Sequence, residues 1–574
     1  MATGDQGGPL VVGINRTADG SICVMRGSTM VAAIQKERIT RQKHHWGKLG
    51  DLRDVYRGVV TGLDEPIDAL VECYSSDAEI DNLEAYEAEI AEVLNLKPGA
   101  KRARISHHLA HLYSVFHPSP FDEAAVMIVD GQGSPVGELT EHWAEAGNFP
   151  PAWREVSSFY RVDRSGRLEC LGKQLFEGDD GNPVGLGMFY FLMTQAMFPG
   201  EGNEGKVMGL APHGDPDALG LPPLDVDGYK VTIPQAWRDI IAVRPRFRFD
   251  PKDPKKNFQD IANLAAAGQR AFEEALLKLA HWVHEKTGLK NLCFAGGTGL
   301  NCSANDLLLR RTPFERVFIP PAPSDAGTSI GCAVYGLTEL LMQPCEWRWT
   351  RDYLGPEPKR SDIDAAIEAA DDLIVDKPAN LHQAMVDLLT QNKVVALYHG
   401  GSEFGPRALG HRSIIADPRT DGIRDWINAK VKDRELFRPL APIVLLEHAD
   451  RFFDMRRPSP FMQFAAPVHP EAKDVIPATT HVDCTARLQT VGPDDDPFLR
   501  GLIQAFHERT GVPVLLNTSY NRREEPIVET PAQAIETFRR TPMHALAMPP
   551  YLLRKKQEPE APRFDDDAGT ATKA

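Results

Sequence analysis

The stretch SHHLAH at residues 106–111 precedes an apolar run, AAVMIV at 124–129, which ends in DGQG at 130–133. The apolar run predicts a buried strand. The glycines after it predict a turn, which leaves Asp130 at the end of that strand. The histidine-rich stretch begins a second predicted element, a helix over 107–116. This part of the chain therefore predicts a helix, a buried strand and a polar turn.

Two histidines of this stretch are spaced for metal binding. His107 and His111 are four residues apart, so on a helix both imidazoles lie on one face and can share one ion. Two imidazole nitrogens and the carboxylate of Asp130 suit a first-row transition metal and leave positions open for substrate. A chance cluster is the alternative, because this spacing alone is a weak motif in a chain with 18 histidines.

Length and charge narrow the function classes. The chain has 574 residues, which is too long for a single core, and a formal charge of −16. Such an acidic chain is a poor general binder of nucleic acid or of anionic membranes, although local basic clusters can still hold phosphates. We therefore expect neither nucleic acid nor a membrane as a partner.

The cysteines and the N-terminus predict a cytoplasmic protein. The eight cysteines are scattered without a C-x-x-C pair, which is cytosolic usage rather than a disulfide framework. The first nine residues are polar and glycine-rich, unlike a signal peptide. No apolar run in the sequence approaches the ~20 residues of a membrane span.

Periodicity predicts the main elements and a domain boundary. An opening meander of three strands covers 10–35, and a long amphipathic helix at 257–287 is stopped by Gly288. Tryptophan, proline and charge crowd residues 344–359, so we expect a first domain at 1–345 and a linker at 346–376. A second domain at 377–555 and a disordered tail at 556–574 follow.

Three glycine turns in the first domain follow predicted strands. They are Asp19-Gly20, DGQG at 130–133 and GGTGLN at 296–301. Glycines in such positions let backbone N–H groups approach a phosphate closely, although each loop alone could be an ordinary turn. Their wide spacing, with helices between, fits the two-lobed ATP-binding fold shared by actin, hexokinase and the ATP-driven heat-shock chaperones.

A basic cluster marks the second domain. Residues 405–438 contain eight Lys or Arg and five Asp or Glu, a local +3 in a chain of −16. Guanidinium forks bind phosphoanhydrides and acyl phosphates bidentately, so Arg407, Lys432 and Arg438 are candidates for holding such groups. A solvated charged surface is the alternative. A further strand end, NTSYNRR at 517–523, adds polar side chains and an arginine.

Several segments, in order along the chain, resemble the O-carbamoyltransferase family that includes tobramycin carbamoyltransferase and the rhizobial nodulation carbamoyltransferases. They are HHLAH with DGQG, EGKVMGLAPHG, GGTGLN, PPAPSDAG, GPRALGHRS, KVKDRELFRP and NTSYN. The resemblance extends over nearly the whole chain, and so many motifs in the right order are very hard to obtain by chance.

The resemblance implies an α/β fold with two domains. The N-terminal domain would be actin-like and two-lobed, of the Kae type, and the C-terminal domain would be α/β of the YrdC type. In such enzymes the second domain makes carbamoyl adenylate from carbamoyl phosphate and ATP with Mg²⁺. A ferrous ion, or another divalent transition metal, then helps the first domain transfer the carbamoyl group to a hydroxyl. No obligate protein partner is implied.

The resemblance also assigns residues to roles. The metal ligands would be His107, His111, Asp130 and Asp325. Carbamoyl phosphate and nucleotide would be held by catalytic residues in the second domain, with Ser519 nearby: Arg407, Lys432, Arg438 and Arg523. The glycine loops would supply further cofactor contacts: Gly131, Gln132, Gly133, Gly296, Gly297, Gly299 and Asn301.

Two departures from the family pattern stand out. The family has a His-Asp pair after the first strand, where this chain has Ala18-Asp19. A general base would then have to be another group, with Asp19, His44 and His45 as candidates, although each could be a polar turn residue. The second departure is Arg523-Glu524-Glu525-Pro526, where the family tends to have glycine before Glu-Pro.

The acceptor is expected to be a small hydroxylated natural product. The opening GINRT at 13–17 resembles the branch acting on ansamycin macrolactams more than the aminoglycoside branch. A tRNA threonylcarbamoyl-type modification enzyme is the alternative, but it would need a basic face for its partner. An ATP-binding sensor with an actin-like core is a third class, and it leaves the basic cluster and the metal ligands without a purpose.

Overall fold

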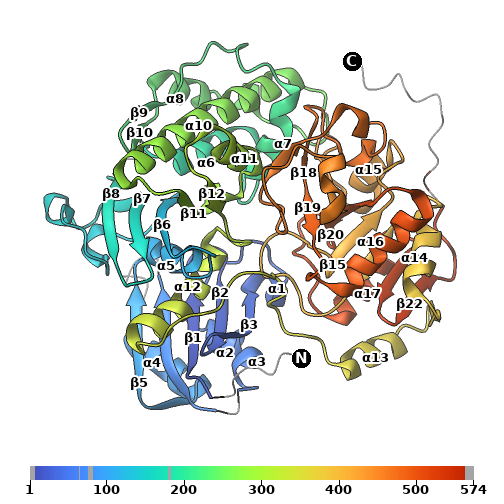
Figure 1. Ribbon diagram of the computed structural model, residues 1–574, viewed down its shortest axis with the longest axis horizontal. Helices are drawn as coiled ribbons and strands as arrows, with labels where there is room; N and C mark the ends of the chain where they lie inside the picture. Colours follow the sequence, from blue (N-terminus) through green and yellow to red (C-terminus); the bar gives the residue numbers. More distant parts are fainter. Residues whose placement is uncertain (1–6, 64, 75–81, 179–182, 561, 563–574) are drawn as a thin grey trace. The chain divides into compact units, whose positions relative to one another are not determined.

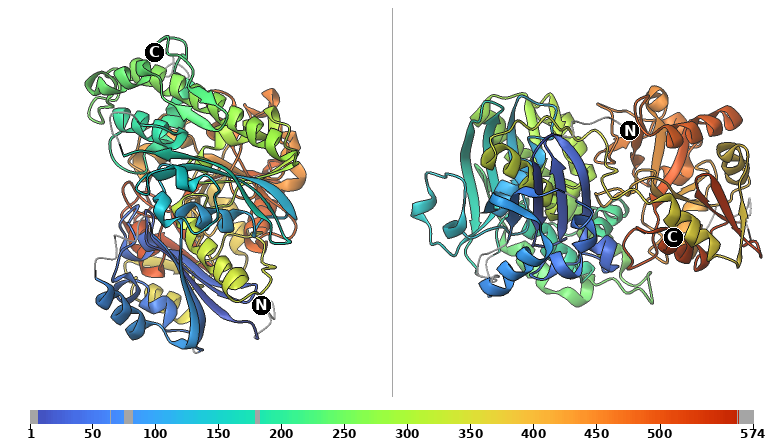
Figure 2. Two further views of the ribbon diagram at one scale, coloured as in Figure 1. Left: turned by 90° about the vertical axis from the view of Figure 1, so that its left-hand side faces the viewer. Right: turned by 90° about the horizontal axis from the view of Figure 1, so that it is seen from below.

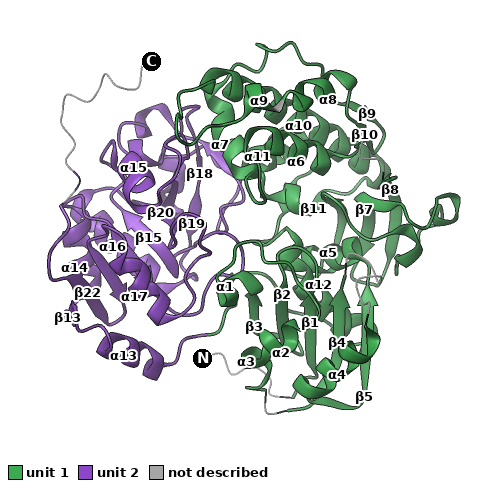
Figure 3. Ribbon diagram, turned by 180° about the vertical axis from the view of Figure 1, so that it is seen from behind, with its two compact units in different colours: residues 1–356 green, residues 357–574 purple. Residues whose placement is uncertain are grey.

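A computed structural model describes residues 7–63, 65–74, 82–178, 183–560 and 562 (Figure 1). The chain divides into two compact units, Met1–Pro356 (unit 1) and Glu357–Ala574 (unit 2), which are coloured separately in Figure 3. In the part of the chain that is described, no helix has both the length and the apolar composition needed to cross a bilayer.

The first sheet of unit 1 has five strands in the order β3-β2-β1-β4-β5. Its β1–β2 and β2–β3 pairs are antiparallel, whereas β1–β4 and β4–β5 are parallel. The blue strands at its β3 side are the meander predicted from the sequence, and they lie side by side in Figure 2. The strands are β1 (Leu10–Asn15), β2 (Ser21–Arg26), β3 (Thr29–Gln35), β4 (Ile67–Cys73) and β5 (Leu96–Ile105).

The second sheet of unit 1 repeats the same topology. Its order is β12-β11-β6-β7-β8. Strands β6, β7 and β8 again form an antiparallel meander, and β11 pairs in parallel with β6 and with β12. This repeat of one α/β unit confirms the expected two-lobed, actin-like fold. The strands are β6 (Glu123–Val129), β7 (Arg154–Asp163), β8 (Leu168–Phe176), β11 (Asn291–Ala295) and β12 (Arg316–Phe318).

Two helices, α5 (His107–Val115) and α12 (Thr328–Tyr335), lie between the two sheets (Figure 1). Glycines let them approach closely. A Cβ atom at Gly331 of α12 would lie 1.9 Å from the carbonyl oxygen of Ala110 in α5. A Cβ atom at Gly13 of β1 would lie 2.1 Å from the carbonyl oxygen of Ser329. The start of α12 is therefore held beside α5 and β1.

Some of the remaining elements of unit 1 pack on the two sheets, and others pack on helices α6 and α10. The long predicted helix is α10, which ends at Gly288 in the left-handed conformation (φ 64°). Short helices beside the first sheet are α1 (Lys36–Thr40), α2 (Asp51–Asp54), α3 (Arg57–Val60) and α4 (Leu83–Val93). The second lobe adds α6 (Leu186–Met197), α7 (Glu204–Leu210), β9 (Asp225–Asp227), β10 (Lys230–Thr232), α8 (Gln235–Ala242), α9 (Arg244–Phe247), α10 (Phe258–Thr287) and α11 (Cys302–Arg311).

Unit 2 is built on an eight-stranded mixed sheet in the order β13-β22-β21-β14-β15-β20-β16-β19. Alternate residues of β14 enter different cores, because successive side chains of a strand point to opposite faces. Val395 and Leu397 pack with α14 and α16, whereas Ala396 and Tyr398 pack with α17. This explains why β14 is an uninterrupted apolar run.

The bounds of the elements in unit 2 follow in chain order. The strands are β13 (Leu373–Asp376), β14 (Val395–Tyr398), β15 (Arg412–Ala416), β16 (Ala441–Leu445), β17 (Ala465–Pro467), β18 (Thr485–Arg487), β19 (Gln489–Val491), β20 (Val514–Ser519), β21 (Ala545–Met548) and β22 (Tyr551–Lys555). The helices are α13 (Arg360–Glu368), α14 (Leu381–Leu389), α15 (Ile423–Trp426), α16 (Pro497–Thr510) and α17 (Pro531–Arg539).

The segment expected as a linker, 346–376, is divided between the units. The backbone N–H of Trp349 donates to Pro118, and Leu354 accepts from Ala33, so this part packs on unit 1. Helix α13 and strand β13 belong to unit 2, where β13 pairs with β22. Of the tail expected at 556–574, residues 561 and 563–574 lie outside the described part.

Candidate functional site

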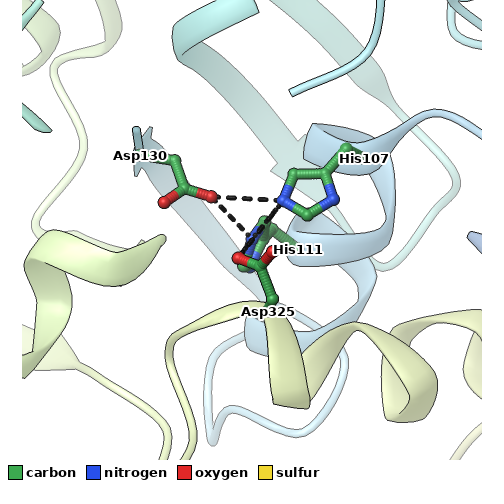
Figure 4. Close-up of side chains that lie close together, drawn as sticks. All are labelled: His107, His111, Asp130 and Asp325. Carbon is green, nitrogen blue, oxygen red and sulfur yellow. Dashed lines mark hydrogen bonds and ion pairs between the residues drawn. The ribbon is translucent and has the colours of Figure 1, made fainter. Parts of the chain in front are cut away.

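Four side chains converge in unit 1 from three elements (Figure 4). His107 and His111 come from α5, Asp130 follows β6, and Asp325 begins the short helical turn before α12. Nε2 of His107 and Nε2 of His111 each lie 3.2 Å from Oδ2 of Asp130. The same two nitrogens lie 3.4 and 3.8 Å from Oδ1 of Asp325. The structure thus brings together all four predicted metal ligands.

The spacing of these donor atoms fits one metal ion. Bonds of ~2.0–2.2 Å place neighbouring ligands roughly 3.0 Å apart at a right angle and about 3.4 Å apart at the tetrahedral angle. The four donor atoms lie within 4.8 Å of one another. Their charges agree, because two carboxylates beside two neutral imidazoles require two positive charges. A divalent transition metal would meet that need, and imidazole with carboxylate suits such an ion.

The site is buried, and its protonation reflects this. Burial alone would lower the pKa of His107, but Asp325 and Asp130 raise it well above its ordinary value. Burial alone would raise the pKa of Asp130, but hydrogen bonds from His107 and His111 hold it well below its ordinary value. Protons therefore occupy the positions where a metal would bind, and metal binding would release them.

Hydrogen bonds hold the outer oxygen of each carboxylate. Oδ1 of Asp130 accepts from the backbone N–H of Gly131 at 2.8 Å and of Gly297 at 3.0 Å. Oδ2 of Asp325 accepts from the hydroxyl of Thr17 at 3.0 Å. These contacts turn the other oxygen of each carboxylate toward the histidines. Such outer partners are a regular feature of protein metal sites.

Two residues near the ligands were not singled out from the sequence. Sγ of Cys73, at the end of β4, lies 3.6 Å from Nδ1 of His107. Hydrogen bonding with Cys332 and with His107 outweighs burial and lowers the pKa of Cys73 to about 6. Thr17 orients Asp325. Cys73 ends one strand of the first sheet and Thr17 follows another, and that position was the only sequence signal.

The glycine loops, predicted to bind cofactor, have structural roles around Asp130. Gly296 has φ 95°, and a Cβ atom there would lie 2.2 Å from the carbonyl oxygen of Val129. The N–H of Gly133 donates to Glu155, and Gln132 is exposed. Asn301 accepts from Ala304 as the N-cap of α11. Gly299 packs where a Cβ atom would lie 2.8 Å from Cβ of Pro323.

Asp19 lies in the turn where Ala18 replaces the family histidine, and it forms an ion pair with His44. Nδ1 of His44 lies 2.9 Å from Oδ1 of Asp19. The hydrogen bond to Asp19 raises the pKa of His44 to about 9, against the effect of burial. Nδ1 of His45 lies 2.8 Å from the hydroxyl of Thr40, and burial lowers its pKa. The candidates Asp19 and His44 thus form one unit, and His45 is separate from it.

Lys432 and Ser519 meet in unit 2. Nζ of Lys432, a residue that is 3% exposed, donates to the carbonyl oxygen of Ser519 at 2.6 Å and to its hydroxyl at 3.1 Å. It also donates to the carbonyl oxygen of Asn521 at 3.0 Å and to Oδ1 of Asn521 at 2.6 Å. The ammonium group is therefore held between the end of β20 and the segment after it. The sequence named Ser519 and left Asn521 without a role.

Arg438 lies among other cations. Burial lowers its pKa, Glu435 opposes this, and Arg487 and Arg523 lower it further. Burial, Arg438 and Arg487 likewise lower the pKa of Arg434 well below its ordinary value. So many guanidinium groups in a partly buried region favour an anionic ligand. Arg434 and Arg487 were not singled out from the sequence; Arg407 is partly buried in the loop after β14.

Both units match models of one protein family. The model described as carbamoyltransferase N-terminus matches residues 79–334, and the model described as carbamoyltransferase C-terminus matches 386–555. The chain belongs to the carbamoyltransferase family. It is therefore a transferase enzyme, as the sequence motifs predicted.

Carbamoyltransferase relatives extend over most of the chain. Nodulation protein NolNO of Sinorhizobium fredii is 32% identical over 572 residues, which cover 94% of this chain and 79% of the relative. Nodulation protein NolO of Bradyrhizobium diazoefficiens is 34% identical over 467 residues, 79% of each chain. An uncharacterized protein of Synechocystis is 32% identical over 622 residues, with coverages of 94% and 96%. The family likeness thus spans both units.

Among solved structures, full-length HypF in its phosphate- and nucleotide-bound form is similar, with 14% identity. The match covers 58% of this carbamoyltransferase and 56% of HypF, with a TM-score of 0.35. HypF of T. kodakarensis matches with a TM-score of 0.36, also at 14% identity, over 58% of this chain and 48% of its own.

Proposed function

We propose that this chain is an ATP-dependent O-carbamoyltransferase that acts on a small hydroxylated natural product. Carbamoyl phosphate and water would give carbamate and phosphate. Carbamate would attack the α-phosphorus of ATP, which forms carbamoyl adenylate and releases pyrophosphate. The acceptor hydroxyl would attack the carbamoyl carbon, which gives the carbamate ester, AMP and a proton.

Unit 2 is the proposed place of activation. Carbamoyl phosphate and ATP are polyanions, and Lys432 and Arg438 supply cations in a region where burial strengthens electrostatic interactions. Arg523 is exposed and adds positive charge beside Arg438. The three N–H groups of Lys432 are already directed at four surrounding oxygens, so its charge is held in place without reorganisation. Arg407 is assigned to the same function on the family motif.

Unit 1 is the proposed place of transfer. The observation that carries this proposal is the convergence of His107, His111, Asp130 and Asp325 around one buried point. A ferrous or other divalent transition-metal ion held there would act as a Lewis acid on a carbonyl or phosphoryl oxygen. The chain's own part is to hold the four ligands, and Thr17 and Gly297 fix the carboxylates for it. For the general base we propose the His44–Asp19 pair, because Asp19 directly follows Ala18, the residue that replaces the family histidine.

The acceptor is proposed to be an ansamycin-type macrolactam rather than an aminoglycoside. Support comes from the resemblance of the opening segment at 13–17 to the macrolactam branch of the family. The last residue of this segment, Thr17, donates a hydrogen bond to Asp325. In this proposal Mg²⁺ accompanies ATP, and the protein acts in the cytoplasm without nucleic acid or an obligate protein partner.

A single incubation tests the proposal. The full chain is supplied with ATP, Mg²⁺, carbamoyl phosphate and a panel of macrolactams and aminoglycosides, and the products are analysed by mass spectrometry. We expect a mass gain of one carbamoyl group on a macrolactam, with equal amounts of AMP and pyrophosphate. Carbamoylation without consumption of ATP would refute the adenylate route, and modification of aminoglycosides alone would refute the acceptor class.

A further inference from the structure

A second cluster of metal-ligating side chains lies in unit 2, apart from the basic residues. His399 directly follows β14, and His411 directly precedes β15, its antiparallel neighbour. The backbone N–H of His399 donates to the carbonyl oxygen of His411 at 3.0 Å, and the ring centroids are 4.8 Å apart. Both Nε2 atoms face Oδ2 of Asp496, at 3.2 Å from His399 and 3.4 Å from His411.

Asp496 is oriented independently of the histidines. It is the N-cap of α16, and its Oδ1 accepts from the backbone N–H of Leu499 at 2.7 Å. That bond is the usual capping interaction of an aspartate before a helix. It leaves Oδ2 as the oxygen that faces both imidazoles.

The hydrogen bonding of His411 turns its Nε2 toward Asp496. Its Nδ1 lies 2.7 Å from the carbonyl oxygen of Gly401, and a carbonyl only accepts, so Nδ1 carries the hydrogen. In the neutral imidazole Nε2 then has a lone pair, and this lone pair points toward the carboxylate of Asp496. A cation placed between the two atoms would be coordinated by both of them.

The donor set has the composition and spacing of a metal site. Its three donor atoms lie within 4.8 Å of one another. The distances of 3.2 and 3.4 Å match the roughly 3.4 Å that ligands on ~2.1 Å bonds have at the tetrahedral angle. The side chain of His399 is 25% exposed and that of Asp496 is 12% exposed, so water can reach one side. We propose that His399, His411 and Asp496 bind a divalent transition-metal ion, with water completing its coordination.

Such an ion would fix the loop that carries Arg407. His399 and His411 are the two ends of this loop, and Asp496 begins α16. The part of the loop directly after Arg407 is anchored by the side chains of Gln489 and Asn517, which donate to the carbonyl oxygens of Leu409 and Ala408. The ends would be joined to α16 by the ion. The three ligands are thus positioning residues for the loop.

Zinc binding to the full chain tests the proposal. The metal-free chain is titrated with Zn²⁺ against a chromophoric chelator, and retained zinc is counted by mass spectrometry. His399→Gln and Asp496→Asn each remove one ligand, and the asparagine retains the capping oxygen. The control is His507→Gln, since His507 also forms a histidine pair, with His448, at a ring-centroid distance of 4.7 Å.

We expect the wild type and His507→Gln to bind one zinc more per chain than the two site variants. The affinity of the affected site should fall by at least about tenfold, the lower end of the loss on removing even an indirect partner of a ligand. Equal zinc content and affinity in all four proteins would overturn the proposal. Imidazole ¹⁵N spectra of the wild type give a reading that needs no variant. Zn²⁺ should shift Nε2 of His399 and His411, and unchanged resonances would also overturn it.

Discussion

Replacement of Thr17 by valine is the sharpest test of the metal centre in unit 1, because it leaves all four ligands in place. Valine has nearly the shape of threonine but lacks the hydroxyl. Thr17 is 1% exposed, and its hydroxyl lies 3.0 Å from Oδ2 of Asp325 and 2.7 Å from Oδ1 of Asn15. The variant therefore removes a buried donor beside a ligand.

The size of the effect follows from the partners that remain. Oδ1 of Asn15 still accepts from the backbone N–H of Thr17 at 2.9 Å, so it keeps a donor. Oδ2 of Asp325 loses the hydroxyl donor that orients it. Loss of such an indirect partner lowers metal affinity by about 10–100-fold, which corresponds to about 1.4–2.7 kcal/mol. The free energy of unfolding should fall by about 1 kcal/mol for the lost hydrogen bond.

The assay is anaerobic titration of the full chain with Fe²⁺, beside thermal unfolding without metal. Thr17→Ser keeps the hydroxyl and should restore affinity. Thr194→Val is the matched control, because Thr194 is fully buried and its hydroxyl donates to Tyr190 at 2.8 Å, within α6. It should lose stability and keep wild-type affinity. If Thr17→Val bound Fe²⁺ as tightly as the control, the hydroxyl would not orient Asp325 for metal.

Three further predictions test the transfer role of unit 1, the activation role of unit 2 and the ion pair at the turn with Ala18. His111→Ala should abolish metal retention and carbamoyl transfer while pyrophosphate release from carbamoyl phosphate and ATP continues; loss of both reactions would contradict the division of labour. Lys432→Met should lower pyrophosphate release at least 100-fold with metal content unchanged, and release at the parent rate would refute its role. Asp19 raises the pKa of His44 to about 9 from an ordinary value of 6.5, so its stabilisation is complete below pH 6.5 and is lost as the pH rises through 9. Asp19→Asn should therefore be less stable than wild type at pH 6 and equally stable at pH 10 in chemical denaturation, and a constant difference would show that the ion pair is not responsible.

Much of the secondary structure was predictable, because its signals are local. The meander begins at Leu10 and ends at Gln35, as predicted, and α10 begins one residue after its predicted start. Apolar periodicity and a terminal glycine are properties of neighbouring residues, so no distant contact was needed. The structure of the segment 346–376 could not be predicted from such local signals. Its prolines and charges resemble a linker, but its packing on unit 1 and its pairing in unit 2 involve partners far away in sequence.

The glycine loops show the same limit at the site itself. Glycine after a strand predicts a close approach of the backbone, and that approach is present. The sequence alone could not tell that the N–H groups of Gly131 and Gly297 meet the carboxylate of Asp130. The two loops are 166 residues apart in numbering, and only the pairing of β6 with β11 brings them together.

By itself, the sequence determined the family, the spacing of His107 and His111 on one helix face and the concentration of positive charge in the second unit. These depend on residue identity and order along the chain. The tertiary structure decided how Asp325, which the family motif had named, lies beside them, that Thr17 orients it, and that Lys432 lies between Ser519 and Asn521. Each of these contacts joins residues more than 80 positions apart, so packing of the sheets and helices has to form before the site exists.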